Sequence, residues 1–159
     1  MNYGVIDVGS NTVRLCVYDV LCPEKRKFKT IMNRKIMAGL AAYIVDGAFS
    51  DEGIAEAVLT VKKCLKRASY LSPDRVDVFA TAVLRNVSNS AQAIAAIEQG
   101  AGCSISLLSN SDEAHLGFVG ASSRGALDNG ALIDIGGGST EITVIENGVD
   151  VARTSLPQG

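Results

Sequence analysis

The sequence predicts an α/β fold with a mixed β-sheet and flanking helices, and three observations support this class. An apolar segment at residues 3–6 and an alternating segment at residues 13–17 form an opening hairpin. Helical and strand patterns then alternate between residues 51 and 119, which is typical of βαβ crossovers and parallel strands. The hairpin pattern returns near residue 133, which indicates a second unit related to the first.

The first elements are separated by turn residues. Between the strands at 3–6 and 13–17 lies the polar segment Gly9-Ser10-Asn11, which predicts a tight turn. A weaker strand pattern covers residues 27–32. Residues 33–49 contain Gly39 and Gly47 and have no clear period, so we expect them to be mostly loop.

The clearest helix begins at Asp51. Apolar residues recur every three or four positions along it: Ile54, Val58, Val61, Leu65 and Ala68. Ser50 is suited to the N-cap, and acidic residues in the first turn and basic residues in the last match the helix dipole. We expect the helix to end before Pro73.

The remaining elements continue the alternation. We expect strands at residues 76–80 and 104–108, and helices at 90–99 and 111–119. Strands follow at 131–135, 141–145 and 149–155, with Asn147-Gly148 as the turn between the last two. The pattern changes after residue 124, so we expect one unit over residues 1–124 and a second over residues 125–159.

The composition is that of an ordinary soluble protein. Of the 159 residues, 47% are apolar and 20% are charged, and the net charge of −2 provides no basic field for nucleic acid or a membrane. No segment reaches the roughly 18 apolar residues of a membrane span, and no signal peptide is evident, so we expect a cytoplasmic location. The cysteines lack metal-binding spacing, and we expect reduced thiols at Cys16, Cys22, Cys64 and Cys103.

Two pentapeptides share one pattern, IDVGS at residues 6–10 and IDIGG at residues 133–137. In each, an aspartate follows an apolar strand beside a glycine-containing turn. Glycine lets backbone N–H groups approach a phosphate closely, and the carboxylate can hold a hydrated divalent cation there. A single hairpin of this kind is more often only a turn, and neither segment has the spacing of a dinucleotide fingerprint or a P-loop. The repetition favours a phosphate site.

Four segments carry a family resemblance: VIDVGSNTVRL at 5–15, ATAVLRN at 80–86, SNSDEA at 109–114 and IDIGGGSTE at 133–141. They resemble, in order and spacing, four motifs of the exopolyphosphatase and guanosine pentaphosphate phosphatase family of the actin, sugar-kinase and Hsp70 superfamily. The resemblance implies a ribonuclease H-like (actin-like ATPase) lobe with a mixed sheet and flanking helices, followed by the first strands of a second, similar lobe.

The resemblance also implies roles for individual residues. Asp7 and Asp134 would position Mg²⁺ and the attacking water, and Glu113 would activate that water. Arg85 would neutralise phosphate charge, and Glu141 would be a second acidic group of the site. The phosphate cradle would comprise Asp7 together with Gly9, Ser10, Asn11, Gly136, Gly137, Gly138 and Ser139.

The same residues have ordinary structural interpretations. Glu113 is in the first turn of its helix, where the helix dipole favours an acid. Arg85 could be a solvated loop charge, and Glu141 an exposed strand residue. His115, the single histidine, has no motif around it, and we interpret it as a helix-surface residue.

Three functions fit these features. The first is hydrolysis of terminal phosphoanhydrides in polyphosphate or guanosine pentaphosphate, which share the same terminal bond. The second is an ATP-dependent kinase of the same superfamily, and the third is a non-catalytic phosphate or nucleotide sensor. The resemblance implies a complete second lobe, so we expect a truncated chain of doubtful activity alone. Its exposed sheet should pair with another copy or with the missing C-terminal part.

Overall fold

The computed structural model describes residues 1–24, 27–123, 125 and 127–159, and internal contacts divide the chain into Met1–Leu107 and Leu108–Gly159. The lobe boundary predicted at residue 124 lies outside the described residues. Helix α4 (Asn110–Ser122) contacts the strands of the second unit and belongs to it.

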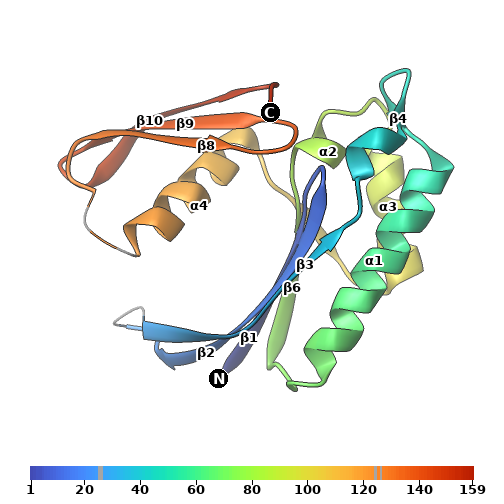
Figure 1. The fold of residues 1–159 in the computed structure, drawn as a ribbon, viewed down its shortest axis with the longest axis horizontal. Coiled ribbons are helices and arrows are strands. Elements are labelled where there is room, and N and C mark those ends of the chain that lie inside the picture. Colours follow the sequence, from blue (N-terminus) through green and yellow to red (C-terminus); the bar gives the residue numbers. More distant parts are fainter. Residues whose placement is uncertain (25–26, 124, 126) are drawn as a thin grey trace. The chain divides into compact units, whose positions relative to one another are not determined.

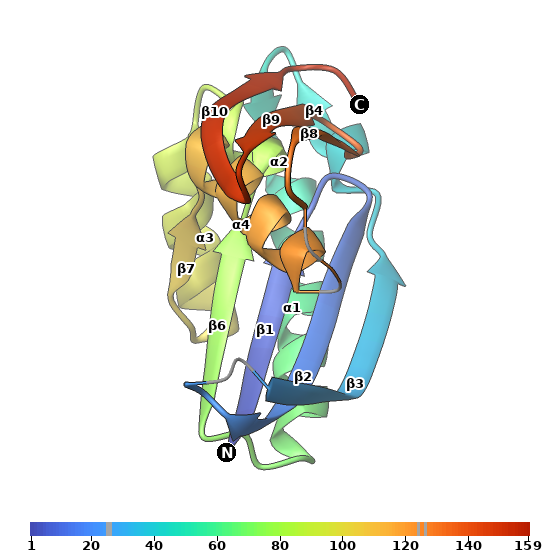
Figure 2. The ribbon, with the colours of Figure 1, turned by 90° about the vertical axis from the view of Figure 1, so that its left-hand side faces the viewer.

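A five-stranded mixed sheet forms the centre of the first unit, with the strand order β3-β2-β1-β6-β7. Its strands are β1 (Asn2–Val8), β2 (Thr12–Cys22), β3 (Lys27–Met37), β6 (Arg75–Ala80) and β7 (Ile105–Leu107). The first three are antiparallel, whereas β1, β6 and β7 run parallel, as Figure 2 shows. The predicted hairpin and the mixed sheet are therefore confirmed.

Two helices, α1 (Asp51–Ser69) and α3 (Ser90–Ala101), cover one face of this sheet (Figure 1). They cross closely at Gly100, where a Cβ atom would lie 2.7 Å from Val58 Cγ2. Cys64 is a fully buried free thiol, and burial raises the pKa of that thiol. The largest core side chains are Phe49, Ile6, Leu15, Leu40, Leu84 and Ile97.

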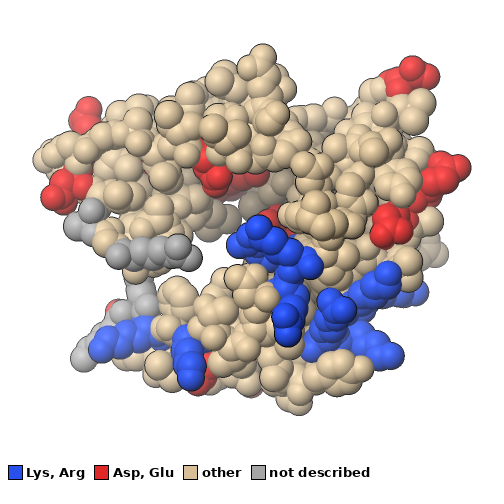
Figure 3. Space-filling view, in the orientation of Figure 1, with Lys and Arg blue, Asp and Glu red and all other residues tan. Residues whose placement is uncertain are grey.

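The ends of α1 follow from its sequence. Ser50 Oγ accepts a hydrogen bond from Gly53 N at 3.2 Å, which satisfies one of the free N–H groups of the first turn. Acidic side chains lie at the N-terminal end of α1 and basic side chains at its C-terminal end (Figure 3). Both groups of charges stabilise the helix through its dipole. The predicted N-cap at Ser50 is confirmed.

The segment predicted as mostly loop is more ordered than expected. Strand β3 continues to Met37, which pairs with Thr12 of β2. Most of its side chains are exposed, so this edge strand lacks the alternation by which strands are recognised. Four further elements are too short to show a period: η1 (Leu40–Tyr43), β4 (Ile44–Val45), β5 (Ala48–Phe49) and α2 (Ala82–Arg85).

The second unit is a three-stranded antiparallel sheet with α4 on one face. Its strands are β8 (Gly130–Ile135), β9 (Thr140–Glu146) and β10 (Val149–Leu156), in the order β10-β9-β8. Asn147 and Gly148 both have positive φ, at 52° and 76°, as the predicted two-residue hairpin turn requires. Within the described part of the chain, no helix is both long and apolar enough to traverse a bilayer.

Candidate active site

The repeated turn is closed by the same backbone hydrogen bond in both units. Gly9 N donates a hydrogen bond to Thr12 O at 3.1 Å, and Gly136 N donates to Ser139 O at 2.9 Å. A Cβ atom would lie 3.0 Å from Thr12 O at Gly9 and 3.1 Å from Ser139 O at Gly136. A side chain at either glycine would crowd the carbonyl that closes the turn, which explains why both turns begin with glycine.

The first turn is fixed to the rest of its unit through backbone groups. Ser10 O accepts a hydrogen bond from Ala41 N at 2.8 Å, and Asn11 O accepts bonds from Ala38 N and Gly39 N at 3.1 and 3.0 Å. The Ser10 residue is buried, whereas the preceding Asp7 is exposed at the end of β1. The turn is therefore held in place, while the carboxylate of Asp7 remains accessible to solvent.

Arg85 lies at the same edge of the sheet as Asp7. Strand β6 runs parallel to β1 with Phe79 opposite Asp7, and α2 begins directly after β6. Thr81 O accepts hydrogen bonds from the N–H groups of Leu84 and Arg85, which fixes this short helix. The carboxyl ends of parallel strands are where open α/β sheets usually bind ligands. Nε and Nη2 of Arg85 are buried.

In the second unit, Asp134 and Glu141 face each other on adjacent strands. Both lie on the α4 side of the sheet, because Asp134 Oδ2 would be 3.6 Å from a Cβ atom at Gly117 of α4. Asp134 is exposed, but Glu141 is 5% exposed and accepts a hydrogen bond from Ser155 Oγ at 2.8 Å. Glu141 is thus a buried acid rather than the exposed strand residue of its ordinary interpretation.

Glu113 lies in the first turn of α4, which Ser109 caps. Ser109 Oγ accepts a hydrogen bond from Asp112 N at 3.1 Å and donates one to Asp112 Oδ2 at 2.6 Å. Gly117 follows Glu113 by one helical turn, so both lie on the flank of α4 that faces Asp134. The fold therefore brings Glu113, Asp134 and Glu141 to one side of the second unit from three separate elements.

The glycine-rich turn at residues 136–138 lies beside these acids, since it follows Asp134 directly. The segment after β10 returns to this turn. A Cβ atom at Gly159 would lie 2.6 Å from Gly138 N, and Thr140 Oγ1 donates a hydrogen bond to Gln158 O at 2.6 Å. A side chain at position 159 would crowd the backbone of the turn.

Comparison with known proteins identifies the family. Residues 22–159 match the Ppx/GppA phosphatase family. The chain belongs to this family. An exopolyphosphatase from Cytophaga hutchinsonii is 26% identical, with a TM-score of 0.89 over 100% of this chain and 51% of that one.

More distant likenesses show the fold of this Ppx/GppA chain. The Aquifex aeolicus Ppx/GppA family member is 22% identical, with a TM-score of 0.83 over 100% of this chain and 52% of that one. MreB5 of Spiroplasma citri, solved with ADP, is 17% identical, with a TM-score of 0.50 over 98% and 52% of the two chains. The fold is that of the actin-like ATPases, as predicted. The Ppx/GppA chain spans about half the length of these proteins.

The acids of this Ppx/GppA chain could supply part of a metal site. Among the residues that the structure describes, no three His, Cys, Asp or Glu side chains form a cluster that could hold one. Mg²⁺, however, is commonly bound by one or two carboxylates and completed by waters and substrate phosphates. Asp134, which is exposed beside a glycine-rich turn, fits such a partial site.

A polar network of the Ppx/GppA chain, on the other flank of α4, is not evident from its sequence. His115, interpreted as a surface residue, places Nδ1 2.7 Å from Asp150 Oδ2. Arg153 lies on the same strand as Asp150 and forms an ion pair with it. The pairing of His115 with Asp150 spans 35 residues and depends on α4 packing on β10, so no local pattern could have indicated it.

Proposed function

We propose that the protein hydrolyses the terminal phosphoanhydride bond of inorganic polyphosphate or of guanosine pentaphosphate. The observation that carries this proposal is the Asp-x-Gly turn, which occurs once in each unit with the same closing hydrogen bond. Membership of a phosphatase family supports a phosphate ligand. The two substrates present the same terminal group, so the proposal covers both.

The two turns would hold the phosphates through backbone N–H groups and short polar side chains. These are Gly9, Ser10 and Asn11 in the first unit and Gly136, Gly137, Gly138 and Ser139 in the second. Arg85 would neutralise negative charge, because its planar guanidinium matches phosphate oxygens. The burial of its Nε and Nη2 atoms would strengthen that attraction, because charges interact more strongly away from water.

Glu113 would act as the general base. The oxygen of a water attacks the terminal phosphorus, the bridging P–O bond breaks, and the water proton passes to the Glu113 carboxylate. Asp134 and Glu141 lie on the same side as Glu113 and would orient this water. The shortened phosphate chain leaves with the bridging oxygen, and inorganic phosphate is the second product.

Mg²⁺ is part of the proposal, with Asp7 and Asp134 as its protein ligands. Both carboxylates are exposed at the turns that would hold the phosphates. The ion would neutralise the charge of the phosphate oxygens. We also propose a cytoplasmic location, as the sequence predicts.

Phosphate release tests the proposal. The full-length protein is incubated with long-chain polyphosphate or guanosine pentaphosphate, with Mg²⁺ or with a chelator, beside the Glu113→Gln variant. Glu113→Gln keeps the shape of the side chain but removes the base, so we expect release to fall by about 100-fold or more. Glu146→Gln, on an exposed strand position, is the matched control and should keep its activity.

The alternatives give different results. A kinase of the same superfamily would transfer the terminal phosphoryl group of ATP to an acceptor and would not release inorganic phosphate in the absence of one. A sensor would be stabilised by phosphate without turnover. Absence of release from both substrates by a folded full-length protein would overturn the proposed hydrolysis. Equal rates for Glu113→Gln and the unmodified protein would remove Glu113 from the mechanism.

A further inference from the structure

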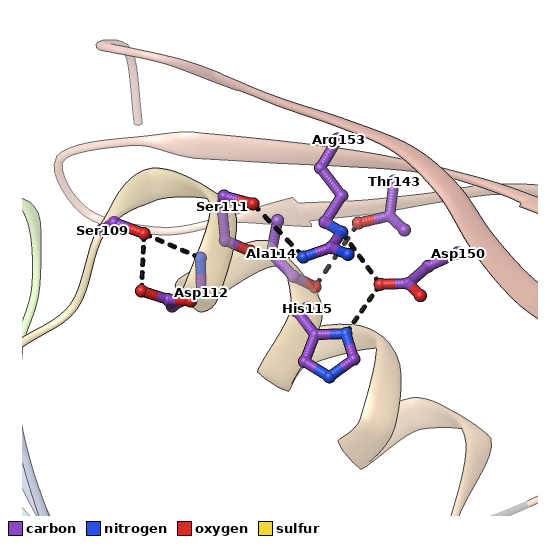
Figure 4. A network of polar contacts seen from close by, with 8 residues as sticks. All are labelled: Ser109, Ser111, Asp112, Ala114, His115, Thr143, Asp150 and Arg153. Carbon is purple, nitrogen blue, oxygen red and sulfur yellow. Dashed lines mark hydrogen bonds and ion pairs between the residues drawn. The ribbon is translucent and has the colours of Figure 1, made fainter.

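Helix α4 is tied to strand β10 by a network centred on one carboxylate oxygen (Figure 4). Asp150 Oδ2 lies 2.7 Å from His115 Nδ1 and 2.9 Å from Arg153 Nε. Arg153 Nη1 donates hydrogen bonds to Ser111 O at 3.3 Å and to Ser111 Oγ at 3.2 Å. Two residues of the strand thus hold a side chain and a backbone carbonyl in the first two turns of the helix.

The three flanks of α4 make different contacts. Ala114 and Phe118 are buried against the sheet, and Thr143 Oγ1 donates to Ala114 O at 3.4 Å. Ser111 and His115, one turn apart, form the flank over β10 that carries the network. Glu113 lies on the opposite flank, with Gly117, towards Asp134 of β8. A rotation of the helix about its axis would move both outer flanks at once.

The contacts of the network oppose such a rotation of α4. The Asp150 side chain is 9% exposed, so its charge needs partners, and the hydrogen bond from His115 and the charge of Arg153 hold its pKa below the usual range. On the other flank, Gly117 has no side chain that could lock the helix against β8. The network and the bond from Thr143 join α4 to the sheet through side-chain hydrogen bonds.

We propose that Asp150 and Arg153 are positioning residues for Glu113, which set the rotation of α4 and hence the place of the base opposite Asp134. This inference rests on the proposed function, because it gives Glu113 the role of base. Its physical reason is the sensitivity of catalysis to geometry, since a displacement of about 1 Å can lower a rate by about 100-fold. Neither residue needs to contact the substrate.

Kinetics of the full-length protein test the inference. Asp150→Asn removes the charge that joins helix and strand, and Arg153→Lys keeps a cation near Asp150 but loses the fork that reaches Ser111. For both we expect kcat to fall by about 10- to 100-fold, with KM for polyphosphate within about two-fold of its original value. Asp150→Glu retains the carboxylate and should lose less activity than Asp150→Asn. Glu146→Gln is the matched acid-to-amide control.

A double-mutant cycle separates positioning from general damage. If Asp150 acts through Glu113, then Asp150→Asn lowers kcat in the unmodified protein but not in the Glu113→Gln background. The same fractional loss in both backgrounds would overturn the inference. A rise in KM with kcat unchanged would also overturn it, because Asp150 would then act on binding.

A second measurement does not depend on activity. Hydrogen–deuterium exchange of the backbone amides at residues 111–117 should be faster in Asp150→Asn than in Glu146→Gln, because the contacts to β10 are weakened. Unchanged exchange would overturn the inference even in an active enzyme. If the unmodified protein is inactive but exchange is faster in Asp150→Asn, the proposed hydrolysis is refuted. The link between α4 and β10 is then retained.

Discussion

At the scale of single residues, Tyr3, Arg75 and Asp77 form a polar cluster on the first sheet. Tyr3 Oη donates a hydrogen bond to Asp77 Oδ2, and Arg75 Nε lies 2.9 Å from Asp77 Oδ1. Arg75 Cζ also lies 6.0 Å from the centre of the Tyr3 ring. The hydrogen bond from Tyr3, with a further one from Arg75, lowers the pKa of Asp77, and the same bond raises the pKa of Tyr3.

These shifts predict a pH dependence of stability. Because the pKa of Asp77 is lower in the folded state, the unfolded state binds more protons in acid, and the contribution of Asp77 is lost as the pH falls below about 4. The contribution of Tyr3 is present below about pH 10 and is lost as the pH rises through its raised pKa. Asp77→Asn should therefore reduce the slope of unfolding free energy against pH in acid, measured by urea unfolding.

Tyr3→Phe is the companion variant, because it removes the hydrogen bond and keeps the ring. It should reduce the acid slope in the same direction and remove the contribution of Tyr3 to the alkaline loss of stability. An acid slope for Asp77→Asn equal to that of the unmodified protein would show that Asp77 has its ordinary affinity for protons in the folded state.

Residue roles differ in how far the sequence reveals them. The Asp7 and Asp134 turns could be predicted because their geometry is local, and the repeated closing bond from Gly9 and Gly136 agrees with it. The burial of Glu141 could not be predicted, because it depends on α4 covering this face of the sheet. The contact between His115 and Asp150 depends on the same packing.

At the scale of elements, the N-cap of α1 makes a contribution to stability that a single substitution can measure. Ser50 Oγ accepts the bond from Gly53 N, so Ser50→Ala leaves an N–H group of the first turn without this partner. We expect a loss of about 1 kcal/mol in the free energy of unfolding, measured by chemical denaturation. Ser90→Ala, at the first position of α3, replaces a serine without a cap bond and should change stability much less.

The elements also show where a pattern reaches its limit. Helix α1 was predictable because its apolar period and both termini agree over many residues. Asn89, in contrast, is a typical cap residue before α3 but makes no cap bond. Its side chain instead exchanges hydrogen bonds with Phe49 N and Phe49 O, both at 2.8 Å, and so fixes β5. Long-range partners take precedence over local preference at such positions.

At the scale of the whole molecule, each unit was predictable as an alternating or antiparallel arrangement, and each has one sheet face covered by helices. The face of the second sheet opposite α4 stays apolar and exposed. Ile133 and Ile135 of β8 are 59% and 72% exposed, and they alternate with Asp134, which faces the helix. Other exposed apolar residues of the three strands are Val144, Val149, Val151 and Leu156.

This apolar face predicts association of the chain of 159 residues. Contiguous exposed apolar surface promotes contact between molecules, whereas isolated apolar side chains are ordinary. The double variant Ile133→Thr with Ile135→Thr keeps residues suited to a strand but reduces the apolar area. We expect it to bind less of a hydrophobic fluorescent dye and to associate less at high concentration in sedimentation velocity. Leu21→Thr, at an exposed position of β2, is the control and should leave both unchanged. Equal dye binding and association by the double variant and the unmodified chain would show that this face does not drive contact, because its loss of apolar surface would then have had no effect.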